Sequence, residues 1–423
     1  MVAEGSPNEG IVIVGGGIAG LATALGLHSG FCRMGLKSQI LESHDSLRTT
    51  GFAFTMGTNA WRALETLGVV DSLRQQHVRL QRVSTTSTVS GATTHVPLTG
   101  RGNFGEYEAR CLRRDLMVEG LARELPRGCI RFGAKVVGIE RKHNGSLLYH
   151  LHLADGTTVK AKVVIGCDGV NSVVAKWLGL PKPGFVGRTA ARGLAHFSDG
   201  HDFEPDLQQY FGDGFRLGFV PCDDKTIYWF FTWYPSHRER EIEDDAEKIK
   251  EVILKKIRGV PKEAQNVIER TKTNCLIASR LRCMWPWNLI WRSICRGAVC
   301  VAGDAFHAMT PEIRQGGCSA LEDGVILARC LGEALLEREN HELEREKAKE
   351  EEERIHKALV KYGRERRWRA IELITTAYVL GFIQQSRGRV MTFVRDTLLS
   401  KLMGRMLLRC SDFDCGKLYV SNP

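Results

Sequence analysis

The chain has 423 residues, enough to bury a large core and to form two or three domains. Charged residues make up 26% and hydrophobic residues 43% of the chain, which excludes a disordered, fibrous or disulfide-stapled protein. The 13 cysteines are odd in number and scattered without metal-ligand spacing, which favours reduced thiols in a cytoplasmic compartment and predicts no metal site.

The net charge of +10 is unevenly placed, because residues 358–409 hold 11 Lys/Arg against 3 Asp/Glu. No base-reading motif is present, so we expect no nucleic-acid partner. In residues 389–409 apolar side chains recur near helical spacing among basic ones. That pattern predicts either a weak peripheral contact with an anionic membrane or a helix packed on its own protein. We recognise no signal peptide or transmembrane helix.

The run IVIVGGGIAGLATALGL, residues 11–27, predicts a buried strand, a tight glycine turn and a helix, and SQILE predicts a second strand. This is the start of a βαβ unit. Gly15 allows the turn, Gly17 lets backbone N–H groups approach a pyrophosphate, and Gly20 permits close packing of helix on strand. Glu42 ends the second strand and can accept hydrogen bonds from a ribose. The spacing therefore predicts a dinucleotide site, NAD or FAD.

The next stretch mixes helices and antiparallel strands. A helix is expected near 61–76, exposed strands over the Thr/Ser-rich segment 80–98, and an amphipathic helix over 115–126. A hairpin turning at Asp155-Gly156 then leads into a buried strand.

Residues 183–283 become rich in β-strand signals, with two strands expected around a turn at Asp223-Asp224. Aromatic residues occur there with period 2, either as the wall of a substrate pocket or as core: Phe211, Phe219, Trp229, Phe231 and Trp233. Arg192 could pair with an anionic substrate or form a surface salt bridge.

The signals of the first domain return at GAVCVAGD, followed by a helix beginning near Ser319. Residues 337–357 carry 15 charged residues in 21, which predicts a solvated helix or a flexible insertion. We therefore divide the chain into a Rossmann-like domain at 1–182, including part of a second sheet near 80–110, a β-rich domain at 183–283, a return at 284–335 and a helical region at 336–423. The expected fold class is α/β, with the smaller β-sheet domain interleaved.

Three separated motifs give the chain a specific resemblance. They are GGGIAG, CDGVNSVV at 167–174, and AGDAFHAMTP with QGGCSALEDG at 302–324. In this order they resemble the group A flavoprotein monooxygenases of the para-hydroxybenzoate hydroxylase type, most closely the plant salicylate-hydroxylase-like branch. The resemblance covers nearly the whole chain.

The resemblance implies an FAD site. Gly15, Gly17 and Gly20 would hold the pyrophosphate together with Ala19 of the same motif, and Glu42 would hold the adenosine ribose. Arg113 would reach the diphosphate, Asp168 and Gly169 would contact FAD and NAD(P)H, and Asp304 would bind the ribityl chain. Gly316 and Gly317 belong to the loop beside the isoalloxazine. The alternatives are a surface helix charge for Arg113, a turn for Asp168 and a helix cap for Asp304.

Members of this family use NADPH or NADH to reduce FAD, and O2 then gives a flavin C4a-hydroperoxide that hydroxylates a small aromatic or related hydrophobic substrate. The protein must exclude water and orient the substrate. His307 could relay a proton or be a packed loop histidine, and no catalytic base is named. The alternatives are a flavin-binding protein with impaired turnover and a flavin reductase or oxidase acting on an isoprenoid.

Arg314 departs from the family pattern, which has glycine at this position of the flavin loop. A left-handed backbone there would cost about 1–2 kcal/mol, and the long side chain must find room. We expect Arg314 to weaken FAD binding or to slow turnover relative to glycine.

Overall fold

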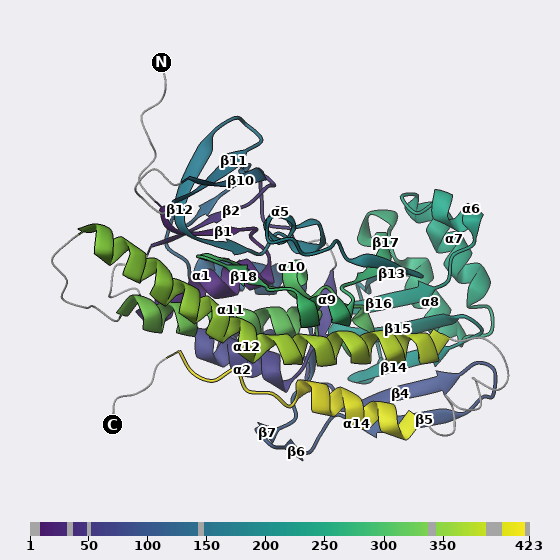
Figure 1. Cartoon of the computed structure of the whole chain (residues 1–423). Helices are drawn as coiled ribbons and strands as arrows, with labels where there is room; N and C mark the ends of the chain where they lie inside the picture. The colour runs from purple at the N-terminus through teal and green to yellow at the C-terminus, as the bar shows by residue number, and fades with distance from the viewer. Residues whose placement is uncertain are drawn as a thin grey trace.

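The computed structural model describes residues 9–31, 37–48, 52–142, 148–336, 344–385 and 400–418. Two large sheets lie next to each other, and the long helix α12 (Glu344–Gln385) runs past both of them (Figure 1). The expected mixed α/β fold with C-terminal helices is confirmed.

The first sheet has eight strands, and its centre is parallel. β1 (Glu9–Val14) lies between β2 (Ser38–Leu41) and β12 (Thr158–Gly166), and β19 (Val299–Val301) pairs with β12 in the same direction. Continuous apolar runs form these strands because both faces are covered. The remaining strands are β9 (Ile130–Arg131), β10 (Val136–Lys142), β11 (Leu148–Leu153) and β18 (Cys295–Arg296). The hairpin expected at Asp155-Gly156 connects β11 to β12.

Helices α1 (Ile18–Phe31) and α11 (Gly316–Leu336) cross closely against this sheet. A Cβ on Gly324 would lie 2.5 Å from the Cβ of Ala22, so only glycine permits the approach. Helix α11 begins at Gly316, three residues before the expected start. The other helices of this region are α2 (Thr58–Leu67), α3 (Val70–Gln76), α4 (Arg114–Arg123), α5 (Val173–Trp177) and α10 (Asp304–His307).

The second sheet has seven strands in the order β17-β13-β16-β15-β14-β4-β5. Their bounds are β17 (Leu276–Cys283), β13 (Gly184–His196), β16 (Thr226–Trp233), β15 (Phe215–Asp223), β14 (Asp206–Phe211), β4 (Arg82–Ser87) and β5 (Thr93–Pro97). The turn expected at Asp223-Asp224 connects β15 to β16. β4 and β5 come from the Thr/Ser-rich segment, so the two sheets share the chain in alternation. α6 (His237–Glu241), α7 (Ala246–Lys256), α8 (Lys262–Arg270) and α9 (Pro286–Trp291) complete this region.

The aromatic stripe on this sheet is core. Phe219, Trp229, Phe231 and Trp233 are buried in one cluster with apolar residues of α7 and α8, which rules out a pocket wall made of these four. Phe211 is opposite Arg216 in the strand register, so it lies on the other face, where it is also buried. Successive strand residues alternate between faces, and α7 and α8 cover the face that carries the four rings.

That other face meets a two-stranded ribbon of β3 (Ala53–Met56) and β8 (Arg110–Arg113). Ala53 and Cys111 of the ribbon share an apolar cluster with Val220, Cys222 and Tyr228 of the large sheet. The interface between the two sheets is therefore packed around the ribbon. A further short hairpin joins β6 (Arg101–Gly102) to β7 (Gly105–Glu106).

Helix α14 (Ser400–Ser411) contains the described part of the basic segment 389–409, and residues up to 399 lie outside the described ones. Met406 and Leu407 pack against a cluster that includes Ile313 and Leu373, so the apolar side of α14 covers the protein itself and peripheral membrane contact is not supported. Among the described residues, no helix has the length and apolar character needed to cross a bilayer.

Candidate functional site

Four of the predicted motifs meet at one edge of the first sheet. Gly15 follows β1, Glu42 follows β2, Asp168 follows β12 and Asp304 follows β19. Because these four strands are parallel neighbours, their carboxyl ends lie along the same edge. The order of strands thus assembles the site from segments almost 300 residues apart.

The glycine loop has both the strain and the space that a pyrophosphate site needs. Gly15 has a φ of +105°, and a Cβ there would lie 2.5 Å from the carbonyl oxygen of Cys167. A Cβ on Gly20 would overlap the carbonyl oxygen of Gly15. A Cβ on Gly17, by contrast, would have no atom within 4 Å, so the backbone of Gly17 faces open space at the start of α1. Ala19 lies inside the first turn of that helix and is buried.

Glu42 is bound to the glycine loop. Its Oε2 accepts a hydrogen bond of 2.7 Å from the N–H of Gly16, and its Oε1 accepts one of 3.0 Å from the N–H of His44. Burial alone would raise the pKa of Glu42, but these hydrogen bonds outweigh it and lower the pKa. The carboxylate is therefore ionised, and it fixes the loop at the place where a ribose would bind.

Asp168 shapes the turn after β12. Its two carboxylate oxygens accept hydrogen bonds from the Ser172 hydroxyl at 2.5 Å and from the Val173 N–H at 2.7 Å. Burial raises the pKa of Asp168, and these hydrogen bonds oppose the rise. Gly169 has a φ of +77°, and a Cβ there would have no atom within 4 Å. The turn therefore leaves open space beside the glycine loop.

Asp304 is the free acid of the site. It begins α10 and is exposed, and within the described residues its carboxylate forms no hydrogen bond or ion pair. Gly303 before it has φ 59° and ψ −144°, a conformation that only glycine adopts easily. Gly316 and Gly317 start α11, and a Cβ on Gly317 would lie 2.9 Å from the ring of Phe54.

A buried ionic cluster supports this loop, and it was absent from the sequence-based expectations. Asp323 accepts hydrogen bonds from the Gly303 N–H at 2.8 Å and from Arg366 Nε at 2.6 Å. Glu322 pairs with Arg366 at 2.6 Å and with Arg369 at 3.2 Å. The signal was the acidic pair Glu322-Asp323 inside an otherwise apolar helix, since buried charges require partners.

His307 belongs to that cluster. It is fully buried, and its Nε2 lies 2.6 Å from Asp323 Oδ2. Its Nδ1 has no hydrogen-bond partner among the described residues. A histidine closed off from solvent in this way fits the packed-loop alternative better than a proton relay.

The two arginines at the end of β8 point to different partners. Arg113 forms a 2.5 Å ion pair with Asp115. Arg114 is the next residue, and its buried Nε has no hydrogen-bond partner within the described part of the chain. Burial lowers the pKa of Arg114, while the Asp304 carboxylate raises it. The charge of Asp304 therefore acts on Arg114, although the sequence motif singled out Arg113.

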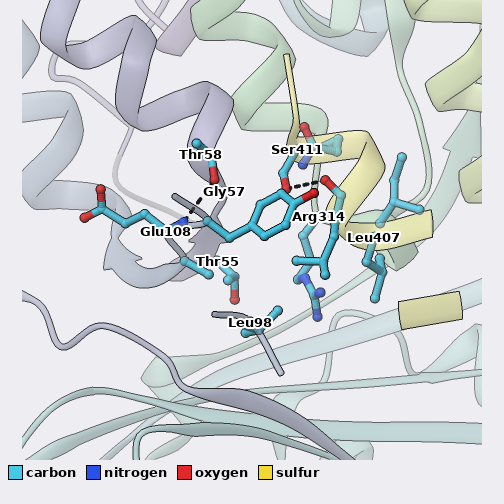
Figure 2. Close-up of a pocket in the computed structure, with 13 residues that line it drawn as sticks. Thr55, Gly57, Thr58, Leu98, Glu108, Arg314, Leu407 and Ser411 are labelled. Atoms are coloured by element: carbon cyan, nitrogen blue, oxygen red, sulfur yellow. Dashed lines mark hydrogen bonds between the residues drawn. The ribbon is translucent and has the colours of Figure 1, made fainter. Parts of the chain in front are cut away.

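Arg314 lines a pocket between the ribbon, the loop after Pro311 and α14. Figure 2 shows this pocket, to which Thr55, Leu98, Leu407 and Ser411 also contribute. Arg314 adopts φ 59° and ψ 25°, the left-handed conformation that its glycine counterparts would accept without cost. Its guanidinium points toward the strands of the large sheet (Figure 2).

The residues at the sheet edge fit FAD. Gly17 leaves its backbone open to a pyrophosphate, Asp304 offers a free carboxylate, and the unpaired Arg114 Nε is a buried donor that calls for an acceptor. Glu42 presents an ionised carboxylate at the end of β2. An extended dinucleotide lying along this edge would use all four.

Comparison with known proteins supports FAD as the cofactor. A family model described as an FAD binding domain matches residues 9–362. Monooxygenase 2 of Arabidopsis thaliana is 49% identical over 420 residues, which are 99% of this chain and 100% of that protein. Monooxygenase 1 of the same plant is 36% identical over 410 residues, 97% of this chain and 99% of that one.

Among solved structures, Klebsiella pneumoniae HpxO complexed with FAD and uric acid matches with a TM-score of 0.77 at 20% identity. The match covers 95% of this chain and 96% of that chain, which shows the same fold. Because the family model spans most of the chain and the plant relatives match nearly all of it, the chain belongs to the FAD-dependent monooxygenases of the aromatic hydroxylase type.

Proposed function

We propose that this enzyme uses NAD(P)H and O2 to hydroxylate a small aromatic or related hydrophobic compound. The observation that carries the proposal is the meeting of the glycine loop, Glu42 and the free Asp304 at the carboxyl ends of adjacent parallel strands. Two of the relatives, FAD-dependent urate hydroxylase and 3-hydroxybenzoate 6-hydroxylase, are named for small planar substrates.

Bound FAD would take a hydride from NAD(P)H and, once reduced, activate O2 for insertion of one oxygen atom into the substrate. The N–H groups at the start of α1 would hold the pyrophosphate, with Ala19 in the same turn. Glu42 would bind the ribose and Asp304 the ribityl chain, and a guanidinium at the end of β8 would neutralise the diphosphate. The loop at Gly316 and Gly317 would bring backbone N–H groups to the edge of the ring system.

The nicotinamide cofactor would need a groove separate from the FAD site, since the sequence has a single Rossmann glycine motif. We place it beside Asp168 and Gly169, where the turn after β12 leaves open space. The apolar interface around the β3–β8 ribbon would exclude water from the reaction. Because every described cysteine is a free thiol, we also propose a reducing compartment such as the cytoplasm.

Arg314 keeps a second candidate open, a flavin-binding protein with impaired turnover. A non-glycine residue in the left-handed region of a flavin loop costs about 1–2 kcal/mol. Its side chain also occupies space beside the pocket (Figure 2).

A substrate panel separates the two candidates. The purified protein would be loaded with FAD and mixed with NADPH or NADH and a series of aromatic compounds, following NAD(P)H oxidation and hydroxylated product. Stimulation of oxidation by one compound, with product formed, supports the monooxygenase. FAD binding without stimulation or product for any compound would support the second candidate.

A further inference from the structure

Two cysteines meet where the β3–β8 ribbon packs against the large sheet. The Sγ atoms of Cys111 on β8 and Cys222 on β15 lie 3.5 Å apart, although 111 residues separate them in the sequence. Both side chains are completely buried, in the apolar cluster that fills this interface. A bond between the two sulfur atoms would therefore connect the ribbon covalently to the large sheet.

The two thiols are close to the distance at which they can bond. A disulfide has an S–S length of about 2.05 Å, so the sulfur atoms would have to approach each other by about 1.5 Å. Small rotations of the two side chains can supply that movement, because β8 and β15 already lie against each other. The backbone of the interface need not rearrange.

The pocket beside Arg314 borders this pair of thiols. Leu98 and Ala109 line the pocket, and both also belong to the apolar cluster that contains the two cysteines. The pocket has room for a few water-sized molecules. An oxidant of that size can therefore come close to the thiols, whereas a molecule as large as glutathione disulfide does not fit.

The surroundings keep the pair reduced in the resting protein. Burial raises the pKa of the Cys111 thiol well above its ordinary value of 9.0, and the neighbouring Cys222 and Asp223 raise the pKa further. The charge of Arg314 lowers the pKa, but its effect is smaller. Because the thiolate is the reacting form of cysteine, we expect oxidation to need a strong oxidant.

We propose that Cys111 and Cys222 form an oxidation site for hydrogen peroxide, which joins them in a reversible disulfide between the ribbon and the large sheet. First, the sulfur of one cysteine attacks a peroxide oxygen and the O–O bond breaks, which gives a sulfenic acid and one molecule of water. The sulfur of the other cysteine then attacks the sulfenic sulfur, the S–S bond forms and a second molecule of water leaves. The two sulfur atoms give two electrons to one peroxide molecule, so no further reactant is needed.

Peptide mapping tests the site directly. FAD-loaded protein would be treated with hydrogen peroxide, quenched with catalase, denatured in an alkylating reagent and digested without reductant for mass spectrometry. The expected product is one peptide containing Cys111 linked to one containing Cys222, lighter by two hydrogen atoms than the two thiol peptides together. Dithiothreitol added before alkylation should remove the link. Glutathione disulfide in place of peroxide should leave both thiols free to be alkylated.

Two variants complete the design. Cys222→Ser should leave Cys111 unlinked, whereas Cys275→Ser removes a less buried thiol and should keep the link. Thermal unfolding gives a second measurement, because a disulfide restricts the unfolded chain. Peroxide treatment should raise the melting temperature by about 2–6 °C in the parent protein and in Cys275→Ser, but not in Cys222→Ser. If Cys222→Ser does not fold, mapping of the parent protein decides the question alone.

Three results would overturn the proposal. They are free thiols at both positions after peroxide treatment, oxidation of either sulfur without the link, and an equally fast link with glutathione disulfide. The outcome is independent of the proposed function, because the disulfide can form in a protein that hydroxylates nothing, and hydroxylation does not require it.

Discussion

The Nε2 atom of His307 lies 2.6 Å from Oδ2 of Asp323, and both side chains are fully buried. The same carboxylate accepts a hydrogen bond from the Gly303 N–H, so it holds the loop that presents Asp304. Removing the charge of Asp323 would leave Arg366 with one carboxylate partner fewer in the core.

We therefore expect Asp323→Asn to lower the free energy of unfolding at pH 7 by about 3–5 kcal/mol, the cost of breaking a buried ion pair. Urea unfolding of the FAD-loaded protein measures it. A loss below about 1 kcal/mol would mean that Glu322 alone satisfies Arg366.

The effect of Asp323 should also depend on pH. Burial raises the pKa of Asp323, but His307 and Arg366 lower it by a larger amount. The pKa of Asp323 is therefore below its ordinary value of 3.8. A group with a lowered folded-state pKa stabilises fully above its unfolded pKa and loses that contribution as the pH falls through the folded value. The stability difference between parent and Asp323→Asn should thus shrink as the pH falls below about 4. A difference that grows on acidification would contradict this.

Two glycines of one motif should respond differently to alanine. Gly17→Ala meets no atom within 4 Å, so the apoprotein should keep its stability within about 0.5 kcal/mol while FAD affinity falls. Gly20→Ala would force a Cβ into the Gly15 carbonyl and should destabilise the apoprotein itself. Thermal unfolding without FAD, followed by FAD titration, separates the two. Equal FAD affinity in Gly17→Ala would mean that the pyrophosphate lies elsewhere.

Asp304→Ala should weaken FAD binding by about 1.5–3 kcal/mol, the value of a hydrogen bond to a charged group. Because the carboxylate forms no hydrogen bond or ion pair with the described residues, the apoprotein should unfold as before. Asp199→Ala, at another exposed aspartate, is the matched control. Isothermal titration with FAD checks both, and an unchanged affinity in Asp304→Ala would reject the ribityl assignment.

Arg314→Gly should stabilise the protein by about 1 kcal/mol, because it relieves a left-handed arginine and removes a buried unpaired donor. We also predict tighter FAD binding or faster turnover in the glycine form, measured side by side with the parent. Arg314→Gln retains the left-handed backbone of a non-glycine residue, so it should not gain the stability that comes from relieving this conformation. Equal or better performance by the arginine form would show that the loop has adapted to it.

The motifs at the strand ends could be predicted because each depends on local spacing and on the parallel order of buried strands. Glycine spacing located the loop at Gly15 and Gly17, and an acid after an apolar run located Asp304. The contacts of these residues could be identified only in the folded structure.

Other features depend on contacts that local pattern does not encode. Period 2 located the rings of Trp229 and Phe231 on one face, but only the docking of α7 and α8 decides that this face is core. Arg113 and Arg114 are adjacent, and only the folded structure shows that Arg113 pairs with Asp115 while the charge of Asp304 acts on Arg114. Arg366, one of the partners of Asp323, lies 43 residues away on another helix.

That sequence separation has a consequence for how the protein is made. During synthesis at about 5–20 residues per second, Asp323 leaves the ribosome roughly 2–9 s before Arg366. Until α12 arrives, Glu322 and Asp323 of α11 lack their arginine partners, and buried charges require such partners. The loop at Gly303 is therefore finished late, and the nascent chain should acquire FAD only once its C-terminal helix has emerged.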